Sequence, residues 1–174
     1  MRSSGPARLV VVVLADTHLR DSDLPRRDLP GQAWELIRQC DVVLHAGDVL
    51  EPGLLRRLSE VAPTHAVLGN NDVALVGHLP ETRQLTLAGV RVAMVHDSGR
   101  RAGRPKRLRR QFPDADLVVF GHSHIPCDGI GIDGQVLFNP GSPTTRRSQP
   151  TCTLGRLVLA EGAIVERCII ALDG

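Results

Sequence analysis

Side chains that commonly bind metal ions occur at five points of the chain, each directly after an apolar run. The five motifs are Asp16-Thr17-His18, Gly47-Asp48, Gly69-Asn70-Asn71-Asp72, His96-Asp97 and Gly121-His122-Ser123-His124. Their candidate ligands are four imidazoles, two carboxylates and one amide, from Asp16, His18, Asp48, Asn70, His96, His122 and His124. This mixture of donors suits Mn, Fe, Co, Ni or Zn better than Mg or Ca. It is large enough for two ions if one carboxylate binds both.

Each of these motifs is weak evidence when it is taken singly. A lone Asp-x-His, Gly-Asp or Gly-Asn-Asn-Asp is most simply a turn. A lone His-x-His is as often found outside a metal site as in one. Five motifs in order, each behind an apolar strand, are difficult to attribute to chance. Because ligands gather at the carboxyl ends of strands in α/β sheets, we expect the five motifs to converge on one site.

The elements that must position these residues read as alternating strands and helices, followed by strands alone. We expect strands at 8–14, 41–46, 64–68 and 116–120, helices at 32–39, 51–60 and 104–111, and hairpins at 83–95, 129–138 and 156–170. The hairpins centre on Ala-Gly, Asp133-Gly134 and Glu161-Gly162, and an Asp-Gly pair favours a type I′ turn. The polar, proline-bearing loop 20–31 lies where a lid over the site could sit.

Length and composition indicate one soluble α/β domain over residues 1–174. Apolar residues make up 42% of the chain and charged residues 23%, which are ordinary values for a globular protein. Aromatic residues make up only 2%, so the core must be aliphatic and there is little to stack on nucleic-acid bases. The formal net charge of +2 names no partner.

The chain shows no predicted membrane segment or disulfide framework. The apolar run 9–15 follows basic residues as in a signal peptide, but it is too short to cross a membrane and fits a buried strand better. The four cysteines are widely spaced and contain no Cys-x-x-Cys pair. We therefore expect a cytoplasmic protein with reduced thiols and no membrane partner.

The ordered motifs, written D-x-H, G-D, G-N-x-D, H and G-H-x-H, resemble the calcineurin-like metallophosphoesterase superfamily, and its small bacterial and archaeal phosphodiesterase branch in particular. The resemblance extends to residues 79–96 and to the loop Asn139-Pro140-Gly141-Ser142. It implies two packed mixed β-sheets flanked by α-helices. It also implies that one ion is held by Asp16, His18, Asp48 and His124, the other by Asp48, Asn70, His96 and His122, with Asp48 as the bridge.

The activity that this resemblance implies is two-metal hydrolysis of phosphoesters by a metal-activated hydroxide. Manganese is our first choice of metal, ahead of Fe, Co, Ni or Zn. Three alternatives stay open: phosphomonoesterase, nuclease, and a non-catalytic scaffold like a related eukaryotic trafficking subunit that has lost ligands.

Asn71 departs from the superfamily pattern. Many relatives carry a histidine there that protonates the leaving group, and the small branch often carries cysteine. Asparagine cannot deliver a proton, and general acid catalysis typically contributes about 10²–10⁴-fold. We therefore expect phosphodiesters with good leaving groups, of the aryl or cyclic nucleotide type, as small-molecule substrates.

Four further positions carry predictions. Asp72 is expected to orient the 69–72 loop and so to serve catalysis. Asp97 either orients His96 or faces solvent. Arg146, with its neighbour Arg147, either binds a substrate phosphate or is a solvated loop residue. His45 is more simply a hydrogen-bonded strand-end histidine than a proton donor.

The segment 100–110 contains seven basic residues. We favour a solvated, salt-bridged helix face over contact with nucleic-acid phosphates, because the total charge is nearly neutral. The expected partner is therefore a small phosphodiester, and nucleic acid is possible but not favoured. Self-association into a homo-oligomer is left open.

Overall fold

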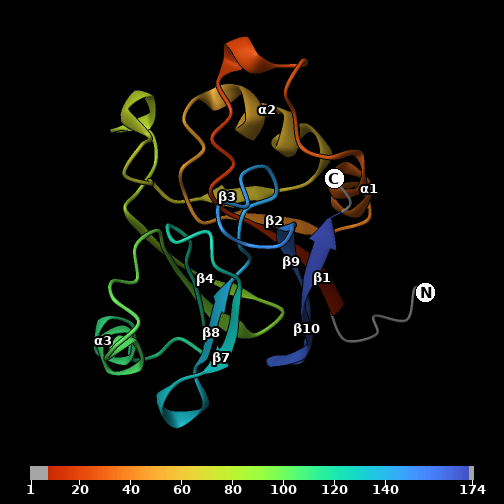
Figure 1. The fold of residues 1–174 in the computed structure, drawn as a ribbon. Helices are drawn as coiled ribbons and strands as arrows, with labels where there is room; N and C mark the ends of the chain where they lie inside the picture. Colours follow the sequence, from red (N-terminus) through yellow and green to blue (C-terminus); the bar gives the residue numbers. More distant parts are fainter. Residues whose placement is uncertain (1–7, 173–174) are drawn as a thin grey trace, which may run out of the picture.

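The computed structural model describes residues 8–172, which fold into two mixed β-sheets packed face to face (Figure 1). The first sheet has the order β10-β9-β1-β2-β3, from Ala163–Leu172, Cys152–Ala160, Arg8–Leu14, Val42–His45 and Thr64–Ala66. The second has the order β4-β5-β6-β8-β7, from Thr82–Leu87, Val90–Val95, Leu117–Val119, Val136–Asn139 and Cys127–Ile130. The expected architecture is confirmed.

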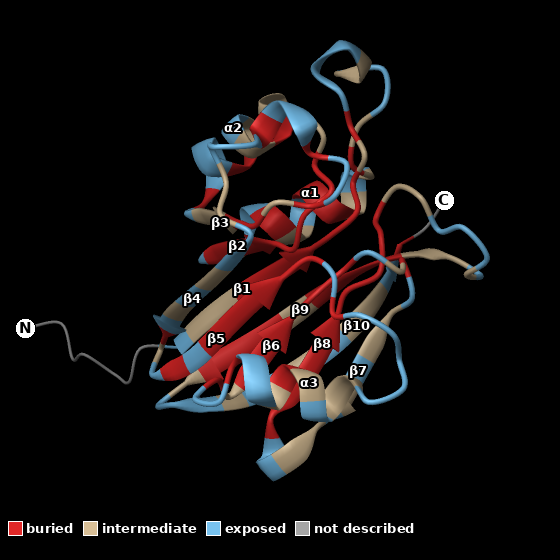
Figure 2. Ribbon diagram, turned by 90° about the vertical axis from the view of Figure 1, so that its left-hand side faces the viewer, coloured by how far each residue is buried: buried red, intermediate tan, exposed pale blue. Residues whose placement is uncertain are grey.

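Each sheet contains three parallel strands, which lie at one side of the first sheet and at the centre of the second. In the first sheet β1 pairs in parallel with β2 and β2 with β3, while β9 and β10 are antiparallel. In the second, β5, β6 and β8 are parallel, while β4 and β7 are antiparallel partners. The strands at the centre of each sheet are buried on both faces, which explains their continuous apolar runs. Figure 2 shows these central strands as buried ribbons between exposed surface segments.

The helices cover the outer faces of the sheets. Val11 and Val13 of β1 point into the core between the sheets, whereas Val12 and Leu14 pack with α1 (Gly31–Arg38) and α2 (Pro52–Val61). On the second sheet, α3 (Arg104–Gln111) packs through Leu108 against residues of β5 and β6. Among the described residues, no helix is long and apolar enough to cross a membrane.

Most predicted boundaries lie within two residues of the observed ones. Helix 104–111 is as predicted, and the other two helices are each shifted by one residue. The third strand is shorter than expected because its pairing with β2 extends only from Thr64 to Ala66. The strand predicted at 156 begins at Cys152 instead, because β9 pairs with β10 over its whole length.

Three type I′ turns close the three predicted hairpins. Both central residues of each turn have positive φ, namely Ala88 (46°) and Gly89 (82°), Asp133 (53°) and Gly134 (77°), and Glu161 (52°) and Gly162 (76°). Around Asp133-Gly134 the turn is closed by the Gln135 N–H, which donates to the Ile132 carbonyl at 3.1 Å. The predicted turn type at Asp133-Gly134 is confirmed.

The loop 20–30 rises above the edge of the sheets at which the candidate site lies (Figure 1). It contains the short 3₁₀ turn η1 (Asp21–Asp23), and residues near both of its ends make polar contacts with α2. The Asp21 carboxylate accepts the Gly53 N–H at 2.7 Å, and Arg57 pairs with Asp28 at 2.7 Å. Arg27 donates to the Thr145 hydroxyl at 3.3 Å, so the loop contacts the chain that follows β8.

Candidate metal centre

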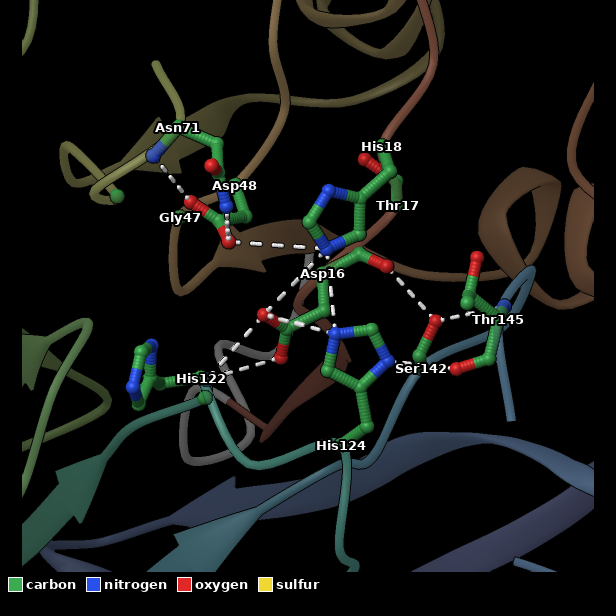
Figure 3. A network of polar contacts seen from close by, with 12 residues as sticks. Asp16, Thr17, His18, Gly47, Asp48, Asn71, His122, His124, Ser142 and Thr145 are labelled. Atoms are coloured by element: carbon green, nitrogen blue, oxygen red, sulfur yellow. Dashed lines mark hydrogen bonds and ion pairs between the residues drawn. The ribbon is translucent and has the colours of Figure 1, made fainter. Parts of the chain in front are cut away.

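The five motifs meet in one place, and Figure 3 shows residues from four of them, with His96 of the fifth close to Asp48. Asp16, His18 and His124 offer one ligand atom each within 4.8 Å of one another. The Nε2 atoms of His18 and His124 are 3.1 Å apart, and His124 Nε2 lies 3.6 Å from Asp16 Oδ1. Two ring nitrogens and a carboxylate oxygen thus face a common point.

A second cluster adjoins the first. Asp16, Asp48 and His96 also bring their ligand atoms within 4.8 Å. Asp48 Oδ2 lies 3.4 Å from His96 Nε2 and 3.6 Å from His18 Nε2, so it stands between the two groups. Asp16 Oδ1 is close to both groups as well, at 3.9 Å from His96 Nε2. The bridging role expected of Asp48 stays a prediction to which this position is suited.

Asn70 brings the remaining histidine into the second group. Its Oδ1 lies 3.0 Å from His96 Nε2 and 3.0 Å from His122 Nδ1. All seven candidate ligands therefore belong to one contiguous arrangement, although they are spread over more than a hundred residues of sequence.

Backbone carbonyls orient two of the histidines. His96 Nδ1 lies 2.7 Å from the Ala46 carbonyl, and His124 Nδ1 lies 2.6 Å from the Thr145 carbonyl. Because a carbonyl only accepts, each Nδ1 must carry a proton, so Nε2 is the nitrogen of each ring that faces the centre and can bind a metal ion once it is deprotonated. Histidines that bind metals in proteins are oriented by such contacts. The donor set therefore fits divalent cations.

Burial shifts the pKa of Asp16, His18 and His124, whereas contacts with neighbouring groups outweigh burial at Asp48 and His96. Burial raises the pKa of Asp16 to about 7, and the neighbouring Asp48 adds to this. Burial likewise lowers the pKa of His18 and His124. For Asp48, burial acts to raise the pKa, but hydrogen bonds with His96 and Asn71 outweigh it and lower the pKa well below its ordinary value. Nearby divalent cations would stabilise the ionised form of both carboxyl groups.

Backbone strain is concentrated on the candidate ligands. Five of them have φ in the left-handed region, namely Asp16 (55°), His18 (46°), Asp48 (58°), His122 (71°) and His124 (59°). Such conformations cost on the order of 1–3 kcal/mol each for residues other than glycine, and they cluster at functional sites. These left-handed conformations were not predicted from the sequence.

Glycines beside the ligands permit the close approach of the strand ends. A Cβ on Gly69 would lie 2.2 Å from the Asp48 nitrogen. A Cβ on Gly121 would lie 2.8 Å from the Ala15 Cβ and 2.9 Å from Asp16 Oδ2. The recurring Gly-ligand pairs of the sequence therefore have a steric cause.

Asp72 ties two of the ligand loops together from beneath. Its buried carboxylate accepts the N–H groups of Asp48 at 2.9 Å, Leu50 at 2.7 Å and Gly69 at 2.7 Å. The predicted orienting role agrees with these contacts, which are structural and do not reach the centre itself.

Asn71 lies at the open side of the site, next to Asp48. Its backbone N–H donates to Asp48 Oδ1 at 2.9 Å, and its side-chain Nδ2 donates to Asp48 Oδ2 at 2.7 Å. The amide side chain is exposed, so it can also meet a ligand that enters the site. It offers hydrogen bonds but no transferable proton.

Of the two roles left open for Asp97, the structure supports exposure to solvent. Asp97 is exposed and accepts the Gly99 N–H at 2.7 Å, while the Ala46 carbonyl orients His96. His45 is fully buried, with Nε2 3.0 Å from the Thr17 hydroxyl and Nδ1 accepting the Gly47 N–H at 3.2 Å. Both of its nitrogens are satisfied, as expected for a structural histidine.

Arg146 is exposed and donates to the Gln149 carbonyl of its own turn at 2.7 Å. Its predicted contact with substrate stays a prediction. The next residue, Arg147, is close enough to the centre for its charge to lower the pKa of Asp16, His18 and His124.

The loop after β8 contributes residues that ligand patterns in the sequence did not single out. Ser142 Oγ donates to the Asp16 carbonyl at 2.7 Å, and Thr144 Oγ1 donates to the Thr17 carbonyl at 2.7 Å. Together with the Thr145 carbonyl, they hold the first ligand motif and His124 in place. Only the Asn-Pro-Gly-Ser sequence that begins this loop was a signal for it.

The chain is similar to known proteins both in sequence and in fold. A profile of the calcineurin-like phosphoesterase superfamily domain matches residues 9–162. A probable metallophosphoesterase of Methanothermobacter thermautotrophicus is 31% identical over 141 residues, which cover 80% of each chain. In fold, the chain is similar to Vacuolar Protein Sorting 29 of Cryptosporidium parvum, with a TM-score of 0.73 and 17% identity over 94% of this chain and 98% of that one. It is also similar to an archaeal phosphodiesterase, with a TM-score of 0.70 and 19% identity over 94% and 99%. At such identities these two structures establish the fold alone.

Proposed function

The chain belongs to the calcineurin-like phosphoesterase superfamily, and from this premise we propose that it is a phosphodiesterase that uses two divalent metal ions. The observation that carries the proposal is the convergence of seven ligands from five separated motifs. The Nε2 atoms of His96 and His124 are turned toward the centre by backbone carbonyls, which a chance cluster of polar residues would not require.

Two ions would be held by the ligand sets that the superfamily resemblance assigns, with manganese as the first choice. When bound, such ions supply Lewis acidity toward a phosphoryl oxygen and lower the pKa of water toward neutrality. The seven residues supply both nitrogen and oxygen donors, a set that suits transition metals.

The chain's own residues bind and orient the substrate. The Asn71 amide donates one N–H to Asp48 Oδ2, and its second N–H would donate to an oxygen of the substrate phosphate. Arg147 supplies a positive charge near Asp16, His18 and His124, and a guanidinium matches the geometry of a phosphate. Asp72 keeps the two loops that carry Asp48 and Asn70 at a fixed separation.

The absence of a proton donor at Asn71 supports a preference for phosphodiesters with good leaving groups. The test is a comparison of bis(p-nitrophenyl) phosphate with p-nitrophenyl phosphate and with a dialkyl phosphate, after loading with Mn²⁺. We expect the aryl diester to be hydrolysed fastest and the dialkyl ester slowest. Faster hydrolysis of the monoester would contradict the proposed substrate class.

The rival function is a protein-binding scaffold. The similarity in fold to Vacuolar Protein Sorting 29 is the reason to consider it. The filled ligand positions favour the enzyme. Metal analysis combined with the same diester assay separates the two functions. A scaffold is expected to show no turnover at any metal loading, and an enzyme is expected to lose turnover when a chelator removes the metal.

A further inference from the structure

The basic surface formed by residues 100–110 carries charges that are mostly not paired with carboxylates. In the described part of the chain, Arg109 is the one residue of the seven in an ion pair, with Asp133 at 3.3 Å. The guanidinium of Arg107 instead donates to the carbonyls of Ser98 and Arg100. Apart from that single ion pair, the salt-bridged face favoured from the sequence is therefore not observed.

The amino-terminal part of this surface lies beside the metal centre. Arg101 and Arg104 line a cavity of about 200 Å³, together with Ser123, Ile125, Pro126 and Cys127. Ser123 separates His122 from His124, which Figure 3 shows on either side of Asp16. Consecutive Cα atoms are about 3.8 Å apart, so the cavity begins within one residue of two candidate ligands.

Arg104 is fixed in the wall of this cavity. Its guanidinium carbon lies 4.9 Å from the centroid of the buried Phe120 ring. Its Nη2 donates to the Gly99 carbonyl at 3.4 Å, whereas its Nε is buried and has no hydrogen-bond partner among residues 8–172. A buried donor without an acceptor costs about 1–3 kcal/mol, so a ligand oxygen that reached this N–H would recover that cost. Phosphate oxygens are well-matched acceptors for a guanidinium.

We propose that Arg101 and Arg104 form an anion subsite for a second phosphate of the substrate, next to the phosphate that is cleaved. The inference rests on the proposed function and narrows its substrate class to phosphodiesters that carry a neighbouring phosphate, as the end of a short oligonucleotide does. Recognition is through phosphate and not through bases, because aromatic residues make up only 2% of the chain and Phe120 is buried.

The test uses two chromogenic substrates that differ by one phosphate. They are the p-nitrophenyl ester of thymidine 5′-phosphate and the same ester with an added 3′-phosphate. For the wild-type protein loaded with Mn²⁺, we expect the added phosphate to lower KM about tenfold, which corresponds to about 1.4 kcal/mol. We also expect this advantage to shrink as the salt concentration rises, because ions screen the attraction between the added phosphate and the two guanidinium groups.

The variants Arg101→Gln and Arg104→Gln are expected to remove this advantage while they leave hydrolysis of the ester without the 3′-phosphate unchanged. Arg110→Gln is the matched control, since Arg110 lies on the same helix but does not line this cavity. Arg101 is exposed, so its variant tests the subsite even if Arg104→Gln destabilises the packing on Phe120. Equal KM values for the two esters in the wild type, or an advantage retained in Arg101→Gln, would overturn the subsite.

Binding measurements separate this inference from the proposed function. Calorimetry with thymidine 3′,5′-bisphosphate and thymidine 5′-phosphate requires no turnover. Tighter binding of the bisphosphate that disappears in Arg101→Gln supports the subsite even if neither ester is hydrolysed, an outcome that would refute the phosphodiesterase. Equal binding of the two nucleotides refutes the subsite even if the esters are hydrolysed.

Discussion

Asn71 is the residue on which the proposed substrate preference depends. Its Nδ2 lies 2.7 Å from Asp48 Oδ2, so a side chain at this position meets the centre directly. An imidazole there adds a proton donor, and general acid catalysis contributes about 10²–10⁴-fold where the leaving group is poor. We predict that Asn71→His raises kcat/KM for a dialkyl phosphate by at least about tenfold and changes it little for an aryl diester.

The measurement is a plot of log(kcat/KM) against the pKa of the leaving alcohol, for the wild type, Asn71→His and Asn71→Gln. The histidine variant is expected to give the flatter line, and the glutamine control to follow the wild type in slope. Parallel lines for all three proteins would show that the absence of a proton donor does not set the substrate preference.

His45 gives a pH dependence at the level of one side chain. Burial lowers its pKa from 6.5 to about 3 in the folded protein. Below pH 6.5 the unfolded chain therefore takes up a proton that the folded chain does not. We predict that the free energy of unfolding falls by about 5 kcal/mol on account of His45 as the pH is lowered from 6.5 toward 3. Above pH 6.5 this residue should make no difference to the pH dependence.

The check is urea unfolding of the wild type and His45→Gln in the presence of a chelator, because other groups titrate over the same range. The difference in unfolding free energy between the two proteins should shrink as the pH is lowered. A difference that stays constant between pH 7 and pH 4 would mean that His45 is not held neutral by its burial.

At the scale of elements, the strand ends depend on glycine as much as on the ligands. A Cβ on Gly69 would collide with the backbone of Asp48 at 2.2 Å, whereas a Cβ on Gly31 would meet nothing within 4 Å. We predict that Gly69→Ala separates the two loops, weakens Mn²⁺ binding more than tenfold and lowers stability by about 1–3 kcal/mol. Gly31→Ala is expected to leave both unchanged.

Calorimetric titration with Mn²⁺ and thermal unfolding of both variants provide the measurement. If Gly69→Ala binds Mn²⁺ as the wild type does, the close approach of the two loops is not what positions the ligands.

The elements themselves were largely predictable because their patterns have local causes. The apolar run of β1 indicates a strand that is buried on both faces. The Asp133-Gly134 pair indicates a turn whose two central residues have positive φ. The strand ends of the ligand motifs were predictable for the same reason. The contribution of Ser142 and Thr144 was not, because it depends on long-range contacts with the carbonyls of Asp16 and Thr17.

Two further features could not be predicted from the sequence, namely the backbone strain at the ligands and the pairing of charged side chains. Asp16 and Asp48 have left-handed φ, a conformation that aspartate adopts more readily than most residues but that most aspartates do not adopt. The segment 100–110 read as a salt-bridged helix, but the carboxylate that it meets in the folded chain is that of Asp133 alone among the described residues. Which charges find partners is decided by tertiary structure.

For the whole molecule, the two sheets act as a scaffold that gathers five strand ends at one edge. Asp48 is central to that arrangement, since it approaches His18 and His96 and accepts hydrogen bonds from Asn71. Loss of its carboxylate is expected to remove a ligand that both metal ions share. Because Asp48 belongs to none of the apolar clusters that form the core, we expect the chain to fold without this carboxylate.

The most direct measurement is a titration of metal-free protein with Mn²⁺ that follows bound metal and hydrolysis of bis(p-nitrophenyl) phosphate together, for the wild type and Asp48→Ala. We predict that hydrolysis by the wild type rises until two ions are bound per chain, and that Asp48→Ala stays folded but hydrolyses the diester at no more than the background rate. Hydrolysis by Asp48→Ala at the wild-type rate, with two ions bound, would contradict the two-metal phosphodiesterase.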